Sequence, residues 1–362
     1  MNAVPQPLGP LGEDDILQWL REDDEARLED LWRAADGVRA ACVGDEVHLR
    51  GLLEVSNHCV RRCAYCGISA LVPGVSRYRM SEEEMLAGAH RARRLGYGTL
   101  VMQSGEDYAV ERDRLSRVIR QIKAETRLAV TLSLGERPQD DLAAWREAGA
   151  DRYLLRFETS DRSLYELLHP PHAGIVSDRI DILRRLQRLG YEIGGGVMVG
   201  IPGQTHRSLA RDIAIFREMD MDMVGVGPYV AHPATPLGSG AVRPPDVGAE
   251  QAPCTDQMTC KVVALTRLVC PEANIPSTTA LGTVAGEDGR ALALRRGANV
   301  VMPNVTPPAY RAAYSIYPGK DTSVETADAW QERWGERLAR MGRTVGTGPG
   351  HRRRRFYPDR KM

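Results

Sequence analysis

Residues Leu189–Val199 read LGYEIGGGVMV, a glycine at the end of a helical pattern followed by a short apolar run. Gly190 stands where a left-handed helix C-cap belongs, and the run after it is typical of a buried strand. The same junction occurs at Leu95-Gly96-Tyr97, Ala148-Gly149-Ala150 and Arg296-Gly297-Ala298. The sequence therefore predicts helices and strands that alternate along the chain.

Eight short apolar runs follow one another from residue 49 onward, with glycine-bearing loops and helical patterns between them. They are Leu49–Val55, Thr99–Gln103, Leu128–Leu134, Arg152–Phe157, Glu192–Val199, Met223–Val226, Asn274–Thr278 and Asn299–Met302. This alternation is typical of a (β/α)8 barrel, which usually has roughly 250 residues. An open doubly wound sheet alternates in the same way, but no G-x-G-x-x-G follows the first run to favour it. We therefore expect an α/β fold, a (β/α)8 TIM-type barrel with N-terminal helices and a C-terminal helical extension.

The two ends of the chain flank this predicted barrel. Residues 1–48 carry the apolar spacing of one or two amphipathic helices, and residues 49–320 form the barrel domain. Residues 321–362 are expected to form a helix over 321–345, which packs on the barrel through Trp330, Trp334 and Leu338, and a basic tail. The basic run His351–Arg355 follows a glycine-rich break, and we interpret it as a disordered tail in preference to a docking segment.

Composition excludes several classes of protein. The 362 residues contain 48 Lys and Arg against 48 Asp and Glu, so the formal net charge is zero. A protein that mainly binds nucleic acid needs a basic surface, so we expect no nucleic-acid partner. No apolar run approaches the length of a membrane span, and the start shows no secretory signal. We expect a cytoplasmic protein with reduced thiols and no membrane association.

Three of the seven cysteines, Cys59, Cys63 and Cys66, lie within eight residues directly after the first predicted strand. A structural zinc site usually has four ligands in two paired arms, and no second arm follows here. Three thiolates on one loop suit a soft-metal cluster, and on a 4Fe–4S cube they leave one iron open for a small molecule. The other four cysteines are isolated: Cys42, Cys254, Cys260 and Cys270.

Polar residues gather where several predicted strands end. In a (β/α)8 barrel the carboxyl ends of the strands form the active site. Polar residues at one strand end are common, but polar residues at several strand ends together indicate a site. These residues are Gln103 to Asp107, Thr131 and Ser133 followed by Gly135 and Glu136, Arg156 to Thr159, Met198 to Thr205, Thr278 and Thr279, and Pro303 and Asn304, followed by Tyr310, Tyr314 and Tyr317.

The cysteine spacing C-x3-C-x2-C, with an aromatic residue before the last cysteine, resembles the radical S-adenosylmethionine superfamily. Ser104-Gly105-Glu106 resembles the Gly-Gly-Glu motif that holds the amino group of S-adenosylmethionine there. Within the superfamily, stretches between residues 50 and 320 resemble the HydE family, whose members help to build the dithiolate-bridged diiron site of FeFe-hydrogenase. These stretches are VTLSLGE (130–136), DRYLLRFET (151–159), MVGIPGQT (198–205), DMVGVGPYVAHPATPL (222–237), IPSTTALGT (275–283), ANVVMPN (298–304) and YSIYPGK (314–320).

The resemblance implies a role for individual residues. Cys59, Cys63 and Cys66 would ligate one 4Fe–4S cluster, and Arg179 would pair with the carboxylate of S-adenosylmethionine. The other residues expected to bind S-adenosylmethionine are Tyr65, Gln103, Ser104, Gly105, Glu106, Glu158 and Met198. The residues expected to line the barrel around a second substrate are Thr131, Arg156, Thr278, Thr279, Tyr314 and Tyr317. Each also has an ordinary structural interpretation, such as a strand-end salt bridge for Arg156.

Two positions depart from the family's pattern. Some HydE enzymes carry three further cysteines after the Tyr-Pro-Gly-Lys segment, and no cysteine follows Lys320 here, which excludes a second cluster at that place. Phe157 stands where the family often has histidine. If Arg156 and Glu158 face the cavity, Phe157 packs outward and the change is harmless. If the strand bulges, a proton donor or a substrate contact is lost.

The sequence thus predicts a radical S-adenosylmethionine enzyme that reductively cleaves S-adenosylmethionine and acts in assembly of the hydrogenase H-cluster. Its second substrate would be a small molecule or a small cysteine-bearing iron complex. Its partners would be other hydrogenase maturases and a reducing donor such as flavodoxin or ferredoxin. The alternatives are a relative of the biotin synthase or methylornithine synthase type, and a non-catalytic iron–sulfur carrier. A carrier would not need Glu158, Arg179 or the Ser104-Gly105-Glu106 loop.

Overall fold

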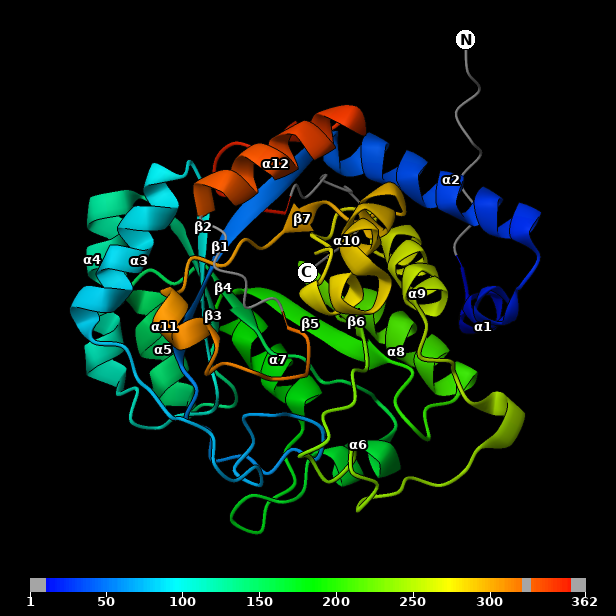
Figure 1. The fold of residues 1–362 in the computed structure, drawn as a ribbon, viewed down its shortest axis with the longest axis horizontal. Coiled ribbons are helices and arrows are strands. Elements are labelled where there is room, and N and C mark those ends of the chain that lie inside the picture. The colour runs from blue at the N-terminus through cyan, green and yellow to red at the C-terminus, as the bar shows by residue number, and fades with distance from the viewer. Residues whose placement is uncertain (1–10, 321–326, 353–362) are drawn as a thin grey trace.

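The computed structural model describes residues 11–320 and 327–352, and its centre is a ring of parallel strands (Figure 1). Hydrogen-bonded neighbours follow the order β6-β5-β4-β3-β2-β1-β7. The strands are β1 (Glu46–Ser56), β2 (Thr99–Ser104), β3 (Ala129–Ser133), β4 (Arg152–Leu154), β5 (Glu192–Val199), β6 (Met223–Pro228) and β7 (Val300–Val301).

The predicted seventh run, Asn274–Thr278, closes this ring although it is not a regular strand. Asn274 and Ser277 form parallel bridges with β6, and Pro276 forms one with Val300 of β7. The segment therefore stands between β6 and β7 and takes the place of the missing barrel strand. The predicted (β/α)8 barrel is confirmed.

Helices cover the outside of the ring, as the alternation in the sequence predicts (Figure 1). The glycines predicted to end helices all have positive φ: +77° at Gly96, +108° at Gly149, +85° at Gly190 and +111° at Gly297. The helices between barrel strands are α3 (Glu82–Arg94), α4 (Arg112–Thr126), α5 (Gln139–Glu147), α6 (Arg162–Leu168), α7 (Arg179–Arg188), α8 (His206–Glu218), α9 (Asp256–Val269) and α10 (Thr279–Arg295), and a short helix, α11 (Pro308–Arg311), follows β7.

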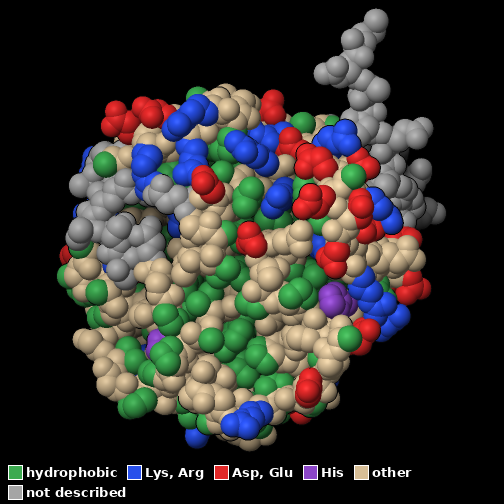
Figure 2. All heavy atoms as spheres, turned by 45° about the vertical axis from the view of Figure 1, so that its right-hand side comes forward, with side chains coloured by type: hydrophobic (Ala, Val, Ile, Leu, Met, Phe, Trp, Pro, Cys, Tyr) green, Lys and Arg blue, Asp and Glu red, His purple; other side chains and the backbone are tan. Residues whose placement is uncertain are grey.

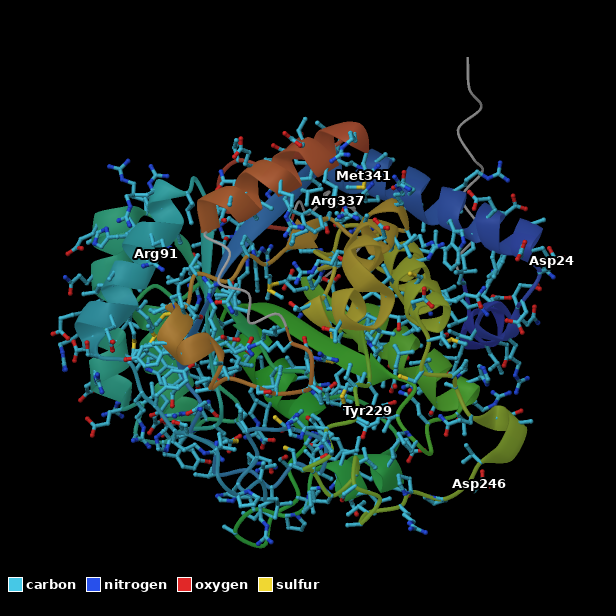
Figure 3. All side chains as sticks on the ribbon, in the orientation of Figure 1. Asp24, Arg91, Tyr229, Asp246, Arg337 and Met341 are labelled. Carbon is cyan, nitrogen blue, oxygen red and sulfur yellow. The ribbon has the colours of Figure 1, made fainter. Side chains whose placement is uncertain are left out.

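The N-terminal residues form the two expected helices, α1 (Glu13–Arg21) and α2 (Glu25–Val43), which pack on α8 and α9. Asp24, labelled in Figure 3, lies at the turn between them, and its side chain accepts a hydrogen bond from the Arg27 N–H at 2.9 Å. Buried Lys261 of α9 donates to the Leu20 carbonyl at 3.2 Å, which ties this turn to the barrel wall.

The C-terminal helix ends earlier than predicted, and residues 321–326 of the predicted helix lie outside the described residues. Helix α12 spans Ala327–Arg340 and packs through buried Trp334 and Leu338, whereas the side chain of Trp330 lies outside the described residues. Residues Thr344–Val345, expected to be helical, form β8 instead and pair in parallel with the start of β1. The chain leaves the helix at Gly342, whose φ is +69°.

The segment after β8 crosses the amino end of the barrel, so the interpretation of the tail as disordered is wrong for residues 351 and 352. The Pro349 carbonyl accepts hydrogen bonds from Thr99 and Arg152, at 2.9 and 2.8 Å. The His351 Nδ1 lies 2.7 Å from a carboxylate oxygen of Glu192. Residues 353–355 of the predicted tail lie outside the described residues. In the ranges 11–320 and 327–352, no helix is long and apolar enough to cross a membrane.

Candidate active site at the carboxyl ends of the strands

The cysteine loop follows β1 and lies, with α6, at the lower end of the molecule in Figure 1. Cys63 is buried, and Cys59 and Cys66 are half-buried; all three are free thiols. The loop is held by backbone hydrogen bonds to two distant segments. The Ala64 N–H donates to the last residue of α6, Leu168, at 2.9 Å, and the Gly67 N–H donates to Ile316 at 2.9 Å.

The three thiols are close enough to influence one another electrostatically. Burial raises the pKa of all three thiols, and it raises that of Cys63 to about 11. The other two thiolates raise the pKa of Cys66 further. A bound cation reverses this effect, because thiolates are the form that ligates metal. Within the described residues, no three His, Cys, Asp or Glu side chains converge on a single-ion site.

Gly105 allows the end of β2 to press against the cysteine loop. A Cβ at this position would lie 2.3 Å from the His58 carbonyl oxygen and 2.8 Å from the Cys59 Cβ. The next residue, Glu106, donates its backbone N–H to the Cys59 Sγ at 3.4 Å. The predicted Ser104-Gly105-Glu106 loop is therefore in direct contact with the first cysteine.

The side chains of this loop are already engaged. The buried Glu106 carboxylate accepts the Glu136 N–H at 2.8 Å and the Tyr108 hydroxyl at 3.0 Å, so it fastens the loop after β3. Ser104 donates its hydroxyl to the Gly105 carbonyl. Gln103 points into the barrel, where its amide donates to the Tyr314 hydroxyl at 3.3 Å.

Beyond β4 the chain forms a bulge that presents Arg156 and Glu158. The N–H groups of Phe157 and Glu158 both donate to the Gly196 carbonyl at 3.1 Å, so two residues oppose one. Glu158 has a φ of +67°, an uncommon conformation for a residue with a side chain. Burial raises the pKa of its carboxyl, although Arg156 Nη2 lies 3.0 Å from Oε2.

Phe157 packs away from the barrel interior in spite of the bulge. Its ring is 1% exposed and lies 5.8 Å, centroid to centroid, from that of Phe216 on α8. The position that differs from the family's pattern therefore faces the helical layer and not the site.

Buried Arg179, at the start of α7, links the bulge to the cysteine loop. Its Nη1 donates to the Arg156 carbonyl at 2.8 Å and lies 3.1 Å from His169 Nε2. The Tyr65 hydroxyl also lies 3.0 Å from His169 Nε2. The Arg179 Nε donates to Glu136 at 2.9 Å. Because an arginine is always a donor, His169 Nε2 is the acceptor. Burial and Arg179 hold the pKa of His169 well below its usual value, so the ring is neutral.

The residues predicted to line the barrel differ in whether their polar atoms have hydrogen-bond partners. Buried Thr131 Oγ1 and Arg156 Nε have no hydrogen-bond partner among the described residues. Thr278 donates to the Val226 carbonyl at 3.0 Å, Tyr314 is buried against Gln103, and Thr279 and Tyr317 are half-buried. Orphaned buried polar atoms are uncommon, so Thr131 and Arg156 mark the part of the interior suited to a polar ligand.

Sequence reasoning missed a buried ion pair at the mouth of the barrel. Lys320, the last residue of the YSIYPGK stretch, pairs with Glu54 of β1, which is 0% exposed, and donates to the Tyr314 carbonyl at 2.9 Å. Its ammonium also lies 4.5 Å from the centre of the Tyr314 ring. His169 was missed as well, and Glu136, although it lies in the VTLSLGE stretch, was given no role. A charged residue in an apolar strand, such as Glu54, was the one signal in the sequence.

Met198 belongs to a small apolar cluster between the barrel and α6. Tyr229, labelled in Figure 3, lies in this cluster below the end of β6. On the face shown in Figure 2, charged side chains crowd the upper half, while the lower half is mostly uncharged. Residues 229–242, which follow β6, contain no Asp, Glu, Lys or Arg. The cluster is formed by Ala64, Leu164, Leu168, Met198, Ile201, Tyr229 and Leu237, with Tyr65 packed against it.

Comparison with known proteins identifies close relatives. Residues 53–214 match the model of the radical SAM superfamily. The FeFe hydrogenase maturase subunit HydE of Thermotoga maritima is 43% identical over 94% of both chains. The 3-methylornithine synthase of Methanosarcina acetivorans is 29% identical over 80% of this chain and 79% of its own. The crystal structure of methylornithine synthase (PylB) has the same fold, with a TM-score of 0.77 and 24% identity over 95% of this chain and 96% of that one.

Proposed function

The chain belongs to the HydE family of FeFe-hydrogenase maturases, within the radical S-adenosylmethionine superfamily, and on that basis we propose how its residues act. It is a radical S-adenosylmethionine enzyme of hydrogenase maturation. When bound, a 4Fe–4S cluster supplies the electron that cleaves S-adenosylmethionine to methionine and a 5′-deoxyadenosyl radical. The residues of the chain bind the two groups, orient them and exclude water.

Cys59, Cys63 and Cys66 hold the cluster in this proposal. The observation that carries it is the contact between the cysteine loop and the end of β2, where a Cβ at Gly105 would lie only 2.3 Å from the His58 carbonyl oxygen, so that the contact requires glycine. Three ligands leave one iron free for S-adenosylmethionine. The cysteine loop is also tied to α6 and to residue 316, so the three thiols stand on a supported scaffold.

S-adenosylmethionine binds between this loop and the bulge after β4. Among the described residues, Arg179 makes its hydrogen bonds through Nε and Nη1, so we assign Nη2 to the methionine carboxylate. Glu158 hydrogen-bonds to the cofactor, and Met198 packs near its adenosyl part. Glu106 acts mainly by ordering the loop, because its carboxylate already binds Glu136 and Tyr108. The remaining contacts come from Tyr65, Gln103, Ser104 and Gly105.

The second substrate lies deeper in the barrel, between Thr131, Arg156, Thr278, Thr279, Tyr314 and Tyr317. The unpartnered polar atoms Thr131 Oγ1 and Arg156 Nε support a polar, anionic ligand there, within the residues described. We propose a small cysteine-bearing iron carbonyl-cyanide complex that another hydrogenase maturase delivers. The electron for the cluster would come from a cytoplasmic donor such as flavodoxin or ferredoxin.

Anaerobic reconstitution tests the radical chemistry. We expect the reduced, reconstituted enzyme to form 5′-deoxyadenosine from S-adenosylmethionine, and Cys63→Ala to form none above background. Cys42→Ala, which removes an isolated thiol on α2, is the matched control and is expected to behave as the native chain. The assignment is wrong if the native chain yields no more product than Cys63→Ala.

Genetic complementation separates this function from that of the methylornithine synthase relatives. The gene is expected to restore hydrogenase activity in a strain that lacks its own hydE. A chain that cleaves S-adenosylmethionine but does not restore hydrogenase would instead indicate another substrate of the same superfamily.

A further inference from the structure

A fully buried carboxylate lies behind the proposed cofactor site, on helix α8. Asp212 is 0% exposed, and its Oδ1 accepts both the backbone N–H and the hydroxyl of Ser160, each at 2.6 Å. Its Oδ2 is buried and has no hydrogen-bond partner in the described part of the chain. Burial of a carboxylate is costly, and an apolar side chain would serve packing better. The carboxylate therefore points to a role beyond filling space.

Ser160 is the junction between the bulge and α6. It stands two residues after Glu158, whose φ is +67°, and one before Asp161, whose side chain caps α6 by accepting the Leu164 N–H at 3.1 Å. An uncommon backbone conformation persists only where the surroundings over-determine it. The two hydrogen bonds from Ser160 to Asp212 are such a constraint, imposed from outside the barrel.

Helix α8 holds this segment at two points. Phe216 lies one turn after Asp212 on the same face, and its ring meets that of Phe157. Helix α6, which begins beside Ser160, in turn receives the Ala64 N–H of the cysteine loop at Leu168 and brings His169 within 3.0 Å of the Tyr65 hydroxyl. A displacement at Ser160 would reach both Glu158 and the cysteine loop.

We propose that Asp212 is a positioning residue for the S-adenosylmethionine site: by holding Ser160 it fixes the bulge that presents Glu158 and the start of the helix that supports the cysteine loop. This inference rests on the proposed function. Asp212 touches neither cofactor nor substrate, and it acts through Ser160.

Equilibrium binding of labelled S-adenosylmethionine to the reconstituted, unreduced holoenzyme tests the proposal. Asp212→Ala is expected to weaken binding by roughly tenfold or more, as for other supporting contacts around a site. Asp212→Asn keeps an oxygen acceptor for Ser160 and is expected to bind within about twofold of the native chain. Ser160→Ala, which keeps the backbone donor, is expected to lie between the two.

Asp222→Ala is the matched control. Asp222 is also 0% exposed and accepts a backbone N–H, that of Ile193 at 2.8 Å, but at the opposite end of the barrel. It is expected to lower thermal stability without changing affinity. Native affinity in Asp212→Ala, or an equal loss in both alanine variants, overturns the proposal. If Asp212→Ala does not fold, native affinity in Ser160→Ala overturns it and weakened affinity supports it. A native holoenzyme that binds no S-adenosylmethionine refutes the proposed function instead.

Discussion

At the scale of the residue, the site depends on a few side chains whose surroundings set their charge. Arg179 is buried among Glu136, His169 and the Arg156 carbonyl, so it stays charged and keeps His169 neutral. Asp212 has the opposite surroundings, because within residues 11–320 and 327–352 its only hydrogen-bond donors are the two groups of Ser160. Burial raises the pKa of Asp212 from 3.8 to about 7 in spite of these hydrogen bonds.

The raised pKa of Asp212 predicts a pH dependence of stability. The pKa of Asp212 is higher in the folded protein than in the unfolded chain. Below about pH 4 the carboxyl is protonated in both states and its ionisation does not reduce the stability of the fold. As the pH rises from there to about 7, the free energy of unfolding decreases. The full loss is at most on the order of 4 kcal/mol. Asp212→Asn cannot ionise and therefore avoids this loss. The free energy of unfolding of the variant should therefore increase relative to that of the native chain as the pH rises across this range. Denaturant titrations of both proteins at several pH values measure the difference, and a constant difference contradicts the assignment.

At the scale of the element, two segments distant in sequence are fastened to the carboxyl ends of the first two strands. Gly105 at the end of β2 lets the cysteine loop approach, and Lys320 ties the segment after α11 to Glu54 of β1. Both contacts are buried, so a substitution that alters either one is expected to disturb the structure around it. Each leads to a separate prediction.

Gly105→Ala is expected to reduce the iron content of the reconstituted enzyme while the barrel still folds. The added Cβ would meet the His58 backbone at 2.3 Å, so the cysteine loop has to move. Gly335→Ala in α12 is the control, because nothing lies within 4 Å of its Cβ position. Helix propensity makes that change stabilising by up to about 1 kcal/mol. Iron analysis and circular dichroism distinguish the two outcomes; native iron content in Gly105→Ala would rule out the tight contact.

A double-mutant cycle tests the buried pair of Lys320 and Glu54. Lys320→Met leaves Glu54 buried without its cation and is expected to cost about 3–5 kcal/mol of unfolding free energy. Glu54→Gln removes the other charge, and the double variant is expected to be more stable than Lys320→Met alone. Denaturant unfolding of the four proteins gives the coupling energy. Additive losses would show that the two side chains act independently.

At the scale of the whole molecule, the barrel has two ends with different tasks. The cysteine loop and α6 gather at the carboxyl ends of the strands (Figure 1), as does the bulge, whereas β8 and residues 346–352 close the amino end. The closing segment supplies carbonyl oxygens to two buried arginines, Arg152 through Pro349 and Arg50 through Gly350. Gly98 makes room for it, since a Cβ there would lie 1.7 Å from the Gly348 carbonyl oxygen.

Removal of the closing segment is expected to destabilise the barrel. A chain that ends at Val345 leaves Arg50 and Arg152 without these acceptors, and each lost acceptor costs roughly 1–3 kcal/mol. A chain that ends at Arg352 keeps every contact named here and is expected to unfold as the native protein does. Thermal and denaturant unfolding of the two shortened chains decide the matter. Equal stability of both would show that the segment contributes nothing to the fold.

Local patterns were sufficient to predict most of the barrel. Strand positions follow from apolar runs, and helix ends follow from glycines such as Gly190, because both depend on a few neighbouring residues. The C-terminal helix was predicted too long, since pairing of Thr344 with Glu46 overrides local helical preference. The tail was misinterpreted for the same reason. Its basic composition suggests disorder, but His351 contacts Glu192 and Arg352 donates to Asp220, partners that lie 159 and 132 positions away in the sequence.

The sequence by itself determined the alternation of strands and helices, the three cysteines and the family, because each is written in contiguous residues. Only the tertiary structure decided which side chains meet. Asp212 reaches Ser160 across 52 positions, Lys320 reaches Glu54 across 266, and Arg179 reaches Glu136 across 43. These contacts join charged or polar groups in a dry interior, where each partner is needed to offset the desolvation of the other. That mutual dependence is a property of the assembled barrel, and no single stretch of the chain contains it.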